Sequence, residues 1–232
     1  HLFVQDEASV QLLRTIGITN TTVVGDTRFD RVLEICHQAK ELPLVEKFKG
    51  NHTAFVAGSS WGPDEDIFIP YLNAHPEVKL IIAPHVIDES HLKEIIGKLN
   101  RTVVRYTQAT EEKVKEADCL LIDCFGLLSS IYRYGEIAYI GGGFGVGIHN
   151  VLEAAVYGMP VIFGPNNKRF REAQGLLQCK GGFEIQGAED FKKIMDNFLN
   201  NYEALDKAGK KAGNYVRDNA GALEKIMHTV TL

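Results

Sequence analysis

The stretch from 139 to 160, YIGGGFGVGIHNVLEAAVYGMP, places glycines, His149 and Asn150 at the start of a helix-like segment that contains Glu153. Glycines allow a backbone to approach a ligand closely, and a helix N-terminus, with about half a positive charge, offers N–H groups to a phosphate. Glu153 could accept hydrogen bonds from ribose hydroxyls. The stretch contains Gly141, Gly142, Gly143 and Gly147, followed by His149 and Asn150.

Two common nucleotide motifs are missing from this loop. The dinucleotide fingerprint needs glycines at relative positions 1, 3 and 6, and no register from Gly141, Gly142 or Gly143 supplies them. The sequence also lacks a GxxxxGK[ST] phosphate loop, so both NAD binding and ordinary ATPase chemistry lose support. A structural role stays open, because Asn150 with Glu153 three residues later forms a capping-box variant, and a lone histidine is seldom a ligand.

A second loop follows the apolar run 54–59. Ser59 and Ser60 are candidates for contact with a sugar or a phosphate. The acids at 64–66 are expected to complement the dipole of the next helix, and Trp61, the only tryptophan, to be a half-buried packing residue.

Three further loops also end apolar runs. Pro84 and His85 follow one, and the segment 123–128 follows another. The loop at 165–171 contains three cations, which a solvated face would also explain.

Eight apolar runs alternate with helix-like stretches along the chain. The runs are continuous, as in parallel strands that are covered on both faces. They lie at 21–25, 54–59, 79–84, 102–106, 119–123, 137–142, 160–165 and 182–186, and the helices are expected near 30–40, 64–74, 88–99, 126–134, 150–157 and 168–178, with two after 188. This pattern predicts an α/β fold with a Rossmann-like, doubly wound parallel sheet, whose ligands bind at the carboxyl ends of the strands.

Both ends of the chain have features of their own. The first thirty residues form a small strand-helix-strand unit, and 210–230 is expected to be one last helix. The chain begins without methionine inside a strand-like segment, so we expect an N-terminal portion to be absent.

Composition excludes several classes of protein. The 232 residues are 45% hydrophobic, and the net charge of −5 argues against general nucleic-acid binding, which needs a basic face. No apolar run is long enough to span a membrane, and no signal peptide is recognisable. The four cysteines form no CxxC pair and are expected to be free thiols.

Taken together, these loops resemble the C-terminal half of the 3-deoxy-D-manno-octulosonic acid (Kdo) transferases, in matching order and spacing. The segments that carry the resemblance are TTVVGDTRFDRV (21–32), FVAGSSWGPDED (55–66), LIIAPH (80–85), LLIDCFGLLSSIYRYGEIAYIGGGF (120–144), GIHNVLEAAVYGMPVIFGP (147–165) and NAGALEKI (219–226). The resemblance implies the C-terminal domain of a GT-B glycosyltransferase. Residues 1–30 would be a remnant of the acceptor domain and the interdomain link, 31–215 the CMP-Kdo domain, and 216–232 a C-terminal helix that could pack toward the absent domain.

The resemblance also implies roles for the loops. The glycine loop, His149 and Asn150 would hold the phosphate and Kdo, and Glu153 the ribose. Ser59 and Ser60 would face the cleft near the donor sugar, and Pro84 and His85 would lie beside the phosphate. The backbone of Phe125, Gly126 and Leu127 would line the cytosine pocket.

The implied reaction transfers Kdo from CMP-Kdo to the lipid A precursor, with inversion. The family's base is a glutamate in the acceptor domain, so no catalytic residue is expected in this chain, which would bind donor and transfer nothing alone. No metal or cofactor is expected. The whole protein would work at the cytoplasmic face of the inner membrane, and this chain itself would be soluble.

Two departures from the family pattern affect the site. Relatives commonly have Pro-Arg-His where Pro84 is followed directly by His85, so an expected guanidinium on the phosphate is missing. Many also have Asp-Thr-Met-Gly-Glu-Leu where this chain has Asp-Cys-Phe-Gly-Leu-Leu (123–128), and Ser where Gly143 stands.

Alternatives from other classes remain. One is a different GT-B enzyme, such as a UDP-sugar transferase or a UDP-N-acetylglucosamine 2-epimerase. The other is a non-catalytic nucleotide-binding domain with a Rossmann sheet.

Overall fold

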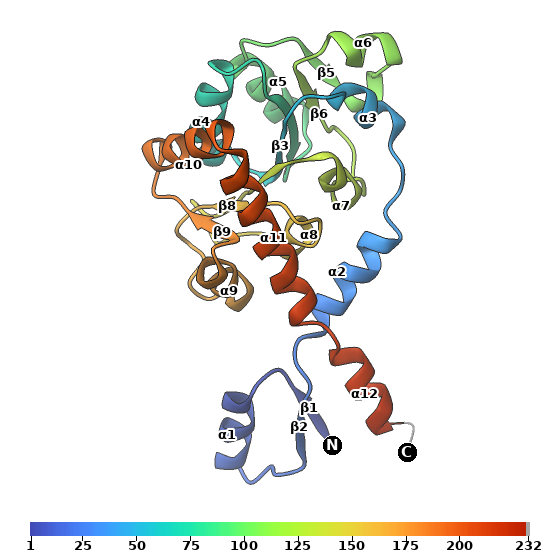
Figure 1. Ribbon diagram of the computed structural model, residues 1–232, viewed down its shortest axis with the longest axis vertical. Helices are drawn as coiled ribbons and strands as arrows, with labels where there is room; N and C mark the ends of the chain where they lie inside the picture. The colour runs from blue at the N-terminus through green and yellow to red at the C-terminus, as the bar shows by residue number, and fades with distance from the viewer. Residues whose placement is uncertain (231–232) are drawn as a thin grey trace.

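A seven-stranded parallel sheet organises the chain in the computed structural model, which describes residues 1–230 (Figure 1). Its strands are, in spatial order, β5 (Val103–Arg105), β6 (Cys119–Leu121), β4 (Lys79–Pro84), β3 (Ala54–Ser60), β7 (Ile137–Ile140), β8 (Val161–Phe163) and β9 (Gly182–Glu184). Every neighbouring pair is parallel. The predicted doubly wound sheet is confirmed, and each predicted apolar run contains a strand.

Helices cover both faces of this sheet because the strand side chains alternate between two apolar layers. On β3, Val56 packs into a layer with α2 (Thr27–His37) and α3 (Pro43–Lys49), whereas Phe55 and Ala57 pack into the other with α4 (Gly62–Asn73) and α5 (Glu89–Lys98). The remaining helices of the domain are α6 (Glu111–Glu116), α7 (Leu128–Ile131), α8 (Leu152–Ala155), α9 (Arg171–Cys179), α10 (Ala188–Asn200) and α11 (Tyr202–Asp218), with 3₁₀ turns η1 (Tyr106–Gln108) and η2 (Tyr132–Tyr134).

The predicted helices need three corrections. The helices α3 and α6 were not predicted, because each has only six or seven residues and shows little apolar periodicity. The predicted helix 150–157 contains only one regular turn, α8. The single helix predicted over 210–230 is wrong: α11 ends at Asp218, and α12 (Ala222–Val230) begins after Gly221, whose φ of 102° breaks the helix.

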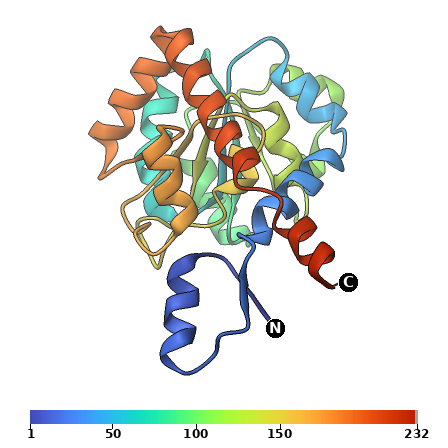
Figure 2. The same ribbon diagram turned by 60° about the horizontal axis from the view of Figure 1, so that its bottom comes forward.

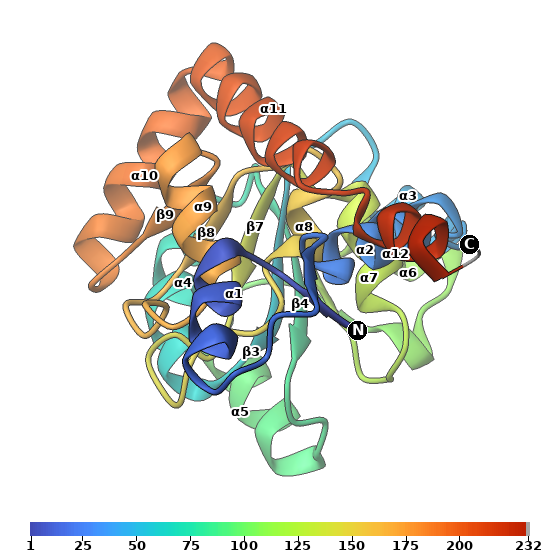
Figure 3. The same cartoon turned by 90° about the horizontal axis from the view of Figure 1, so that it is seen from below.

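The first residues form a separate two-stranded parallel sheet, with β1 (Leu2–Val4), α1 (Glu7–Thr15) and β2 (Thr21–Val23) (Figure 2). The ion pair of Asp6 with Arg171 connects this unit to the main domain. The helix α12 is capped by Asp30 of α2, whose carboxylate accepts bonds of 2.8 and 3.1 Å from the amides of Gly221 and Ala222. Figure 3 looks onto this end and shows α1 and α12 as separate elements.

None of the helices within residues 1–230 combines the length and apolarity needed to cross a membrane.

Candidate functional site

The order in which parallel strands are added to the sheet reverses between β3 and β7. From β3 the chain continues to β4 on one side, and the strands that follow β7 extend on the other side. Ligands of open α/β sheets bind at such a switch point, outside the carboxyl ends of the strands. The loops after β3, β4, β6 and β7 all leave this edge, and the predicted site residues lie at the ends of β3 and β4, in these loops and, for Glu153, in α8.

A pocket of about 230 Å³ lies between three of these loops, those after β3, β4 and β6. Five predicted residues line it: Ser59, Pro84, His85, Phe125 and Gly126. Phe125 is 81% exposed, which leaves its ring available for stacking. Leu127 does not line the pocket; the apolar wall comes instead from Leu128 and Ile122.

Ser59 and Ser60 occupy different environments because the strand is bulged between them. The pairing of β3 with β4 shifts between Gly58 and Ser60, and Ser59 has a left-handed backbone with φ of 52°. Bulges and positive φ values at non-glycine residues are frequent beside functional sites. Ser59 faces the pocket, whereas Ser60 is fully buried and its hydroxyl donates to Glu65 at 2.9 Å. The expectation that both serines face the cleft is therefore wrong for Ser60.

Three rings from three loops stack beside the pocket. Trp61 and His85 stack with centroids 4.6 Å apart, and His85 and His149 stack with centroids 4.4 Å apart. Trp61 also donates from Nε1 to Nε2 of His149 over 3.1 Å. The stack brings together the predicted residues His85 and His149. The contact of Trp61 with them was not predicted, because Trp61 is 88 residues from His149.

Asp64, in the first turn of α4, connects the loops after β3 and β7. Its carboxylate is 1% exposed and accepts bonds from the amide of Trp61 (3.0 Å), the amide of Gly142 (2.9 Å) and the hydroxyl of Tyr139 (2.8 Å). Burial raises the pKa of the Asp64 carboxyl, and the three hydrogen bonds oppose that shift. From the sequence, Asp64 was expected only to complement the dipole of the helix, and its long-range hydrogen bonds to Tyr139 and Gly142 were not predicted.

The glycines after β7 are required mainly by contacts within the protein. A Cβ at Gly143 would lie 2.5 Å from the amide nitrogen of Gly164, which explains why serine does not stand here. Four amides of the loop already donate internally: Gly141 to Gly58, Gly142 to Asp64, and both Gly145 and Gly147 to Gly142. The loop is thus a rigid connection, and these four amides are not free to bind a phosphate.

Asn150 and Glu153 contact each other but do not form the predicted capping box. The Asn150 side chain accepts from the amide of Leu152 at 3.1 Å and donates to Glu153 at 3.0 Å, so the Glu153 carboxylate meets a side chain and not the Asn150 backbone. With one turn in α8, the helix dipole at this point is small. Burial raises the pKa of Glu153. The hydrogen bond from Asn150 opposes that shift, and Glu153 does not line the pocket between the loops.

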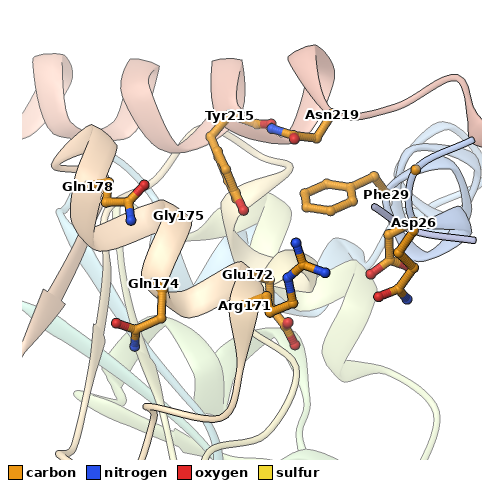
Figure 4. Close-up of a pocket in the computed structure, with 11 residues that line it drawn as sticks. Asp26, Phe29, Arg171, Glu172, Gln174, Gly175, Gln178, Tyr215 and Asn219 are labelled. Carbon is orange, nitrogen blue, oxygen red and sulfur yellow. The ribbon is translucent and has the colours of Figure 1, made fainter. Parts of the chain in front are cut away.

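Two of the other pockets on the described residues contain charged side chains beside the loops. One of about 510 Å³ lies beside the glycine loop and contains Lys168, Arg169 and Glu184. Another of about 420 Å³ lies where the N-terminal unit meets α9 and α11, with Arg171, Glu172 and Tyr215 in its wall (Figure 4). The first takes Gly145 and Val146 from the predicted glycine loop, and the second contains no residue of the predicted site.

The sheet order and the loops at the switch point define the class: the chain has the fold of the C-terminal domain of a GT-B glycosyltransferase. Curated homologues that match across 99% of its length are named Kdo transferase; the 3-deoxy-D-manno-octulosonic acid transferase of Rickettsia bellii is 26% identical over 238 residues, 56% of that protein's length. The chain spans about half the length of the curated relatives it matches. No protein-family model matches it.

Solved structures agree with this fold. The C-terminal CMP-Kdo binding domain of WaaA from Acinetobacter baumannii superposes with a TM-score of 0.65 at 20% identity, over 81% of this chain and 99% of that domain. Anabaena HepE in complex with UDP superposes with a TM-score of 0.61 at 12% identity, over 99% of this chain and 63% of HepE.

Proposed function

We propose that this chain is the donor-binding part of a Kdo transferase, which moves Kdo from CMP-Kdo to the lipid A precursor (lipid IVA) in lipopolysaccharide biosynthesis. The observation that carries the proposal is the convergence of Ser59, His85 and Phe125 on one pocket at the switch point, in a chain whose curated homologues bear this name. Full-length protein would act at the cytoplasmic face of the inner membrane.

The arrangement of the loops suggests how the donor would lie. The cytosine would enter the pocket between Phe125 and Pro84, with the exposed Phe125 ring against its face. The ribose would lie toward Glu153. The phosphate would lie at the stacked histidines, because four amides of the glycine loop are already bonded within the protein.

The chemical step needs a base on the acceptor hydroxyl and stabilisation of charge on the leaving CMP. The second requirement is the one this chain would meet. The base, a glutamate by resemblance, would come from an acceptor domain outside these residues. The N-terminal unit lies on the strand-end side, where Asp6 pairs with Arg171, and α12 leaves Leu223 and Val230 exposed; both features support a division near each end of the domain. Residues 30 and 216 lie within α2 and α11, so the two divisions would fall before Thr27 and after Asp218.

A second candidate is a GT-B enzyme that uses a uridine nucleotide, because HepE with bound UDP has nearly the same fold. The nucleotide base separates the two candidates. We expect CMP to raise the melting temperature of this chain and UMP to leave it unchanged.

The test is a thermal-shift and calorimetric titration of the chain with CMP and UMP. Glu153→Ala should weaken CMP binding about 10-fold or more, since a buried ribose hydroxyl would lose its acceptor. The control is Glu189→Ala, an exposed glutamate on α10. Binding of UMP in place of CMP, or equal effects of the two variants, would contradict the proposal, as would Kdo transfer by this chain alone.

A further inference from the structure

The hydrogen bond between Trp61 and His149 fixes which ring nitrogen of the histidine holds the proton. Indole Nε1 is a donor only, and it lies 3.1 Å from Nε2 of His149. Nε2 must therefore be the acceptor, so the proton of the neutral imidazole is on Nδ1.

The ring has little freedom to turn away from this arrangement. One face stacks on His85, which in turn stacks on Trp61. The Cδ2 edge rests over Gly142, where an added Cβ would approach to 3.1 Å. The residues after β3, β4 and β7 thus hold one imidazole from three directions.

We propose that Trp61 is a positioning residue that keeps His149 in the Nδ1-protonated tautomer, so that the neutral imidazole donates a hydrogen bond to the phosphate of the donor nucleotide. This inference rests on the proposed function for its ligand. It explains how a site without the expected arginine next to Pro84 supplies a phosphate donor at neutral pH.

The surroundings of His149 favour the neutral ring that this role needs. The ionisable groups that face it are His85 and Asp64. Burial lowers the pKa of His149, and proximity to His85 lowers it further, against the opposing charge of Asp64. A neutral imidazole has one donor, and the bond from Trp61 determines that this donor is Nδ1–H.

The first test observes the tautomer without any ligand. With ¹⁵N-histidine labelling at pH 8, the long-range nitrogen–proton spectrum of wild type should show His149 with Nδ1 protonated. Trp61→Phe keeps a stacking ring and removes the donor, so Nε2 should become protonated in a large fraction of molecules. An unchanged tautomer in Trp61→Phe would overturn the proposal, whatever nucleotide the protein binds.

The second test measures the phosphate contribution as the ratio of CMP affinity to cytidine affinity. Trp61→Phe should lower this ratio about 3- to 10-fold and leave cytidine binding unchanged. An asparagine side chain offers a donor near the position of Nδ1, and glutamine near that of Nε2, so His149→Asn should keep more of the ratio than His149→Gln. The reverse order would contradict the proposal; absence of CMP binding in wild type would instead contradict the proposed function.

Discussion

Oδ2 of Asp64 accepts a hydrogen bond of 2.9 Å from the amide of Gly142, which lies 78 residues further along the chain. The same carboxylate accepts from the amide of Trp61 and the hydroxyl of Tyr139. One buried side chain therefore sets the distance between the loops after β3 and β7, and with it the contact of Trp61 with His149.

Asp64→Asn should lower the free energy of unfolding by about 2 to 4 kcal/mol, because an amide cannot accept all three bonds and leaves a buried donor unpaired. Urea unfolding followed by circular dichroism measures this loss. Asp66→Asn is the control: Asp66 lies in the same helical turn, is 65% exposed and pairs with Lys98, so its loss should stay within about 0.5 kcal/mol. Equal losses in the two variants would contradict the assigned role of Asp64.

Gly143→Ala should destabilise the protein by about 1 to 3 kcal/mol, because the new Cβ would press on the backbone of Gly164. Gly145→Ala is the matched change two residues on, where the nearest atom to a Cβ is 3.7 Å away, and it should change stability by less than about 0.5 kcal/mol. Melting temperatures of the two variants measure the difference. If both substitutions were tolerated, Gly143 and Gly164 could not be in such close backbone contact.

Stability should depend on the protonation of His149. Its folded-state pKa is lowered by burial below the ordinary value of 6.5, so the folded protein binds this proton less readily than the unfolded chain. The contribution is therefore complete above about pH 6.5 and is lost as the pH falls through the folded-state pKa. His149→Gln should remove this share of the pH dependence, measured as the difference in unfolding free energy between pH 8 and pH 5.5. The control Asn51→Gln, at an exposed side chain that does not titrate, should leave the dependence as in wild type.

Phe125→Ala should weaken CMP binding about 5- to 150-fold, since an aromatic ring stacked on a base contributes about 1 to 3 kcal/mol. The side chain is 81% exposed, so its removal should barely change the melting temperature. Tyr202→Ala, which truncates a ring that is 78% exposed at the start of α11, serves as the control in the same calorimetric titration. A loss of affinity in the control, or none in Phe125→Ala, would place the base elsewhere.

The sheet could be predicted from the sequence because its strands are covered on both faces and so appear as continuous apolar runs. Phe55, Val56 and Ala57 illustrate this: adjacent side chains enter opposite layers, and all three are fully buried. The break between α11 and α12 could not be read from periodicity, since it depends on Gly221 and on a cap that Asp30 supplies from the other end of the chain.

The loops of the site could be predicted because ligands of parallel sheets bind at the carboxyl ends of the strands. The side-chain contacts between these loops could not be predicted. Asp64 lies in the first turn of a helix, where a carboxylate already has a local explanation as a cap. The one available signal was Tyr139 within the run 137–142, because a buried tyrosine hydroxyl needs a partner. Trp61 and His149 are 88 residues apart, and no motif or periodic pattern in the sequence links them, so their contact could not be predicted.

The bulge at Ser59 makes the length of this loop as important as its composition. Only Ser59 and Ser60 separate Gly58 from Trp61, so deletion of one residue there would leave a single serine for the two positions that the bulge separates. The remaining serine could either donate to Glu65 or face the pocket, and the amide that donates to Asp64 would shift by one position. A one-codon deletion would thus change the core and the pocket together, where a substitution changes one group. Homologous loops can be compared residue by residue only where the number of residues between the last paired strand position and the first helical turn is the same.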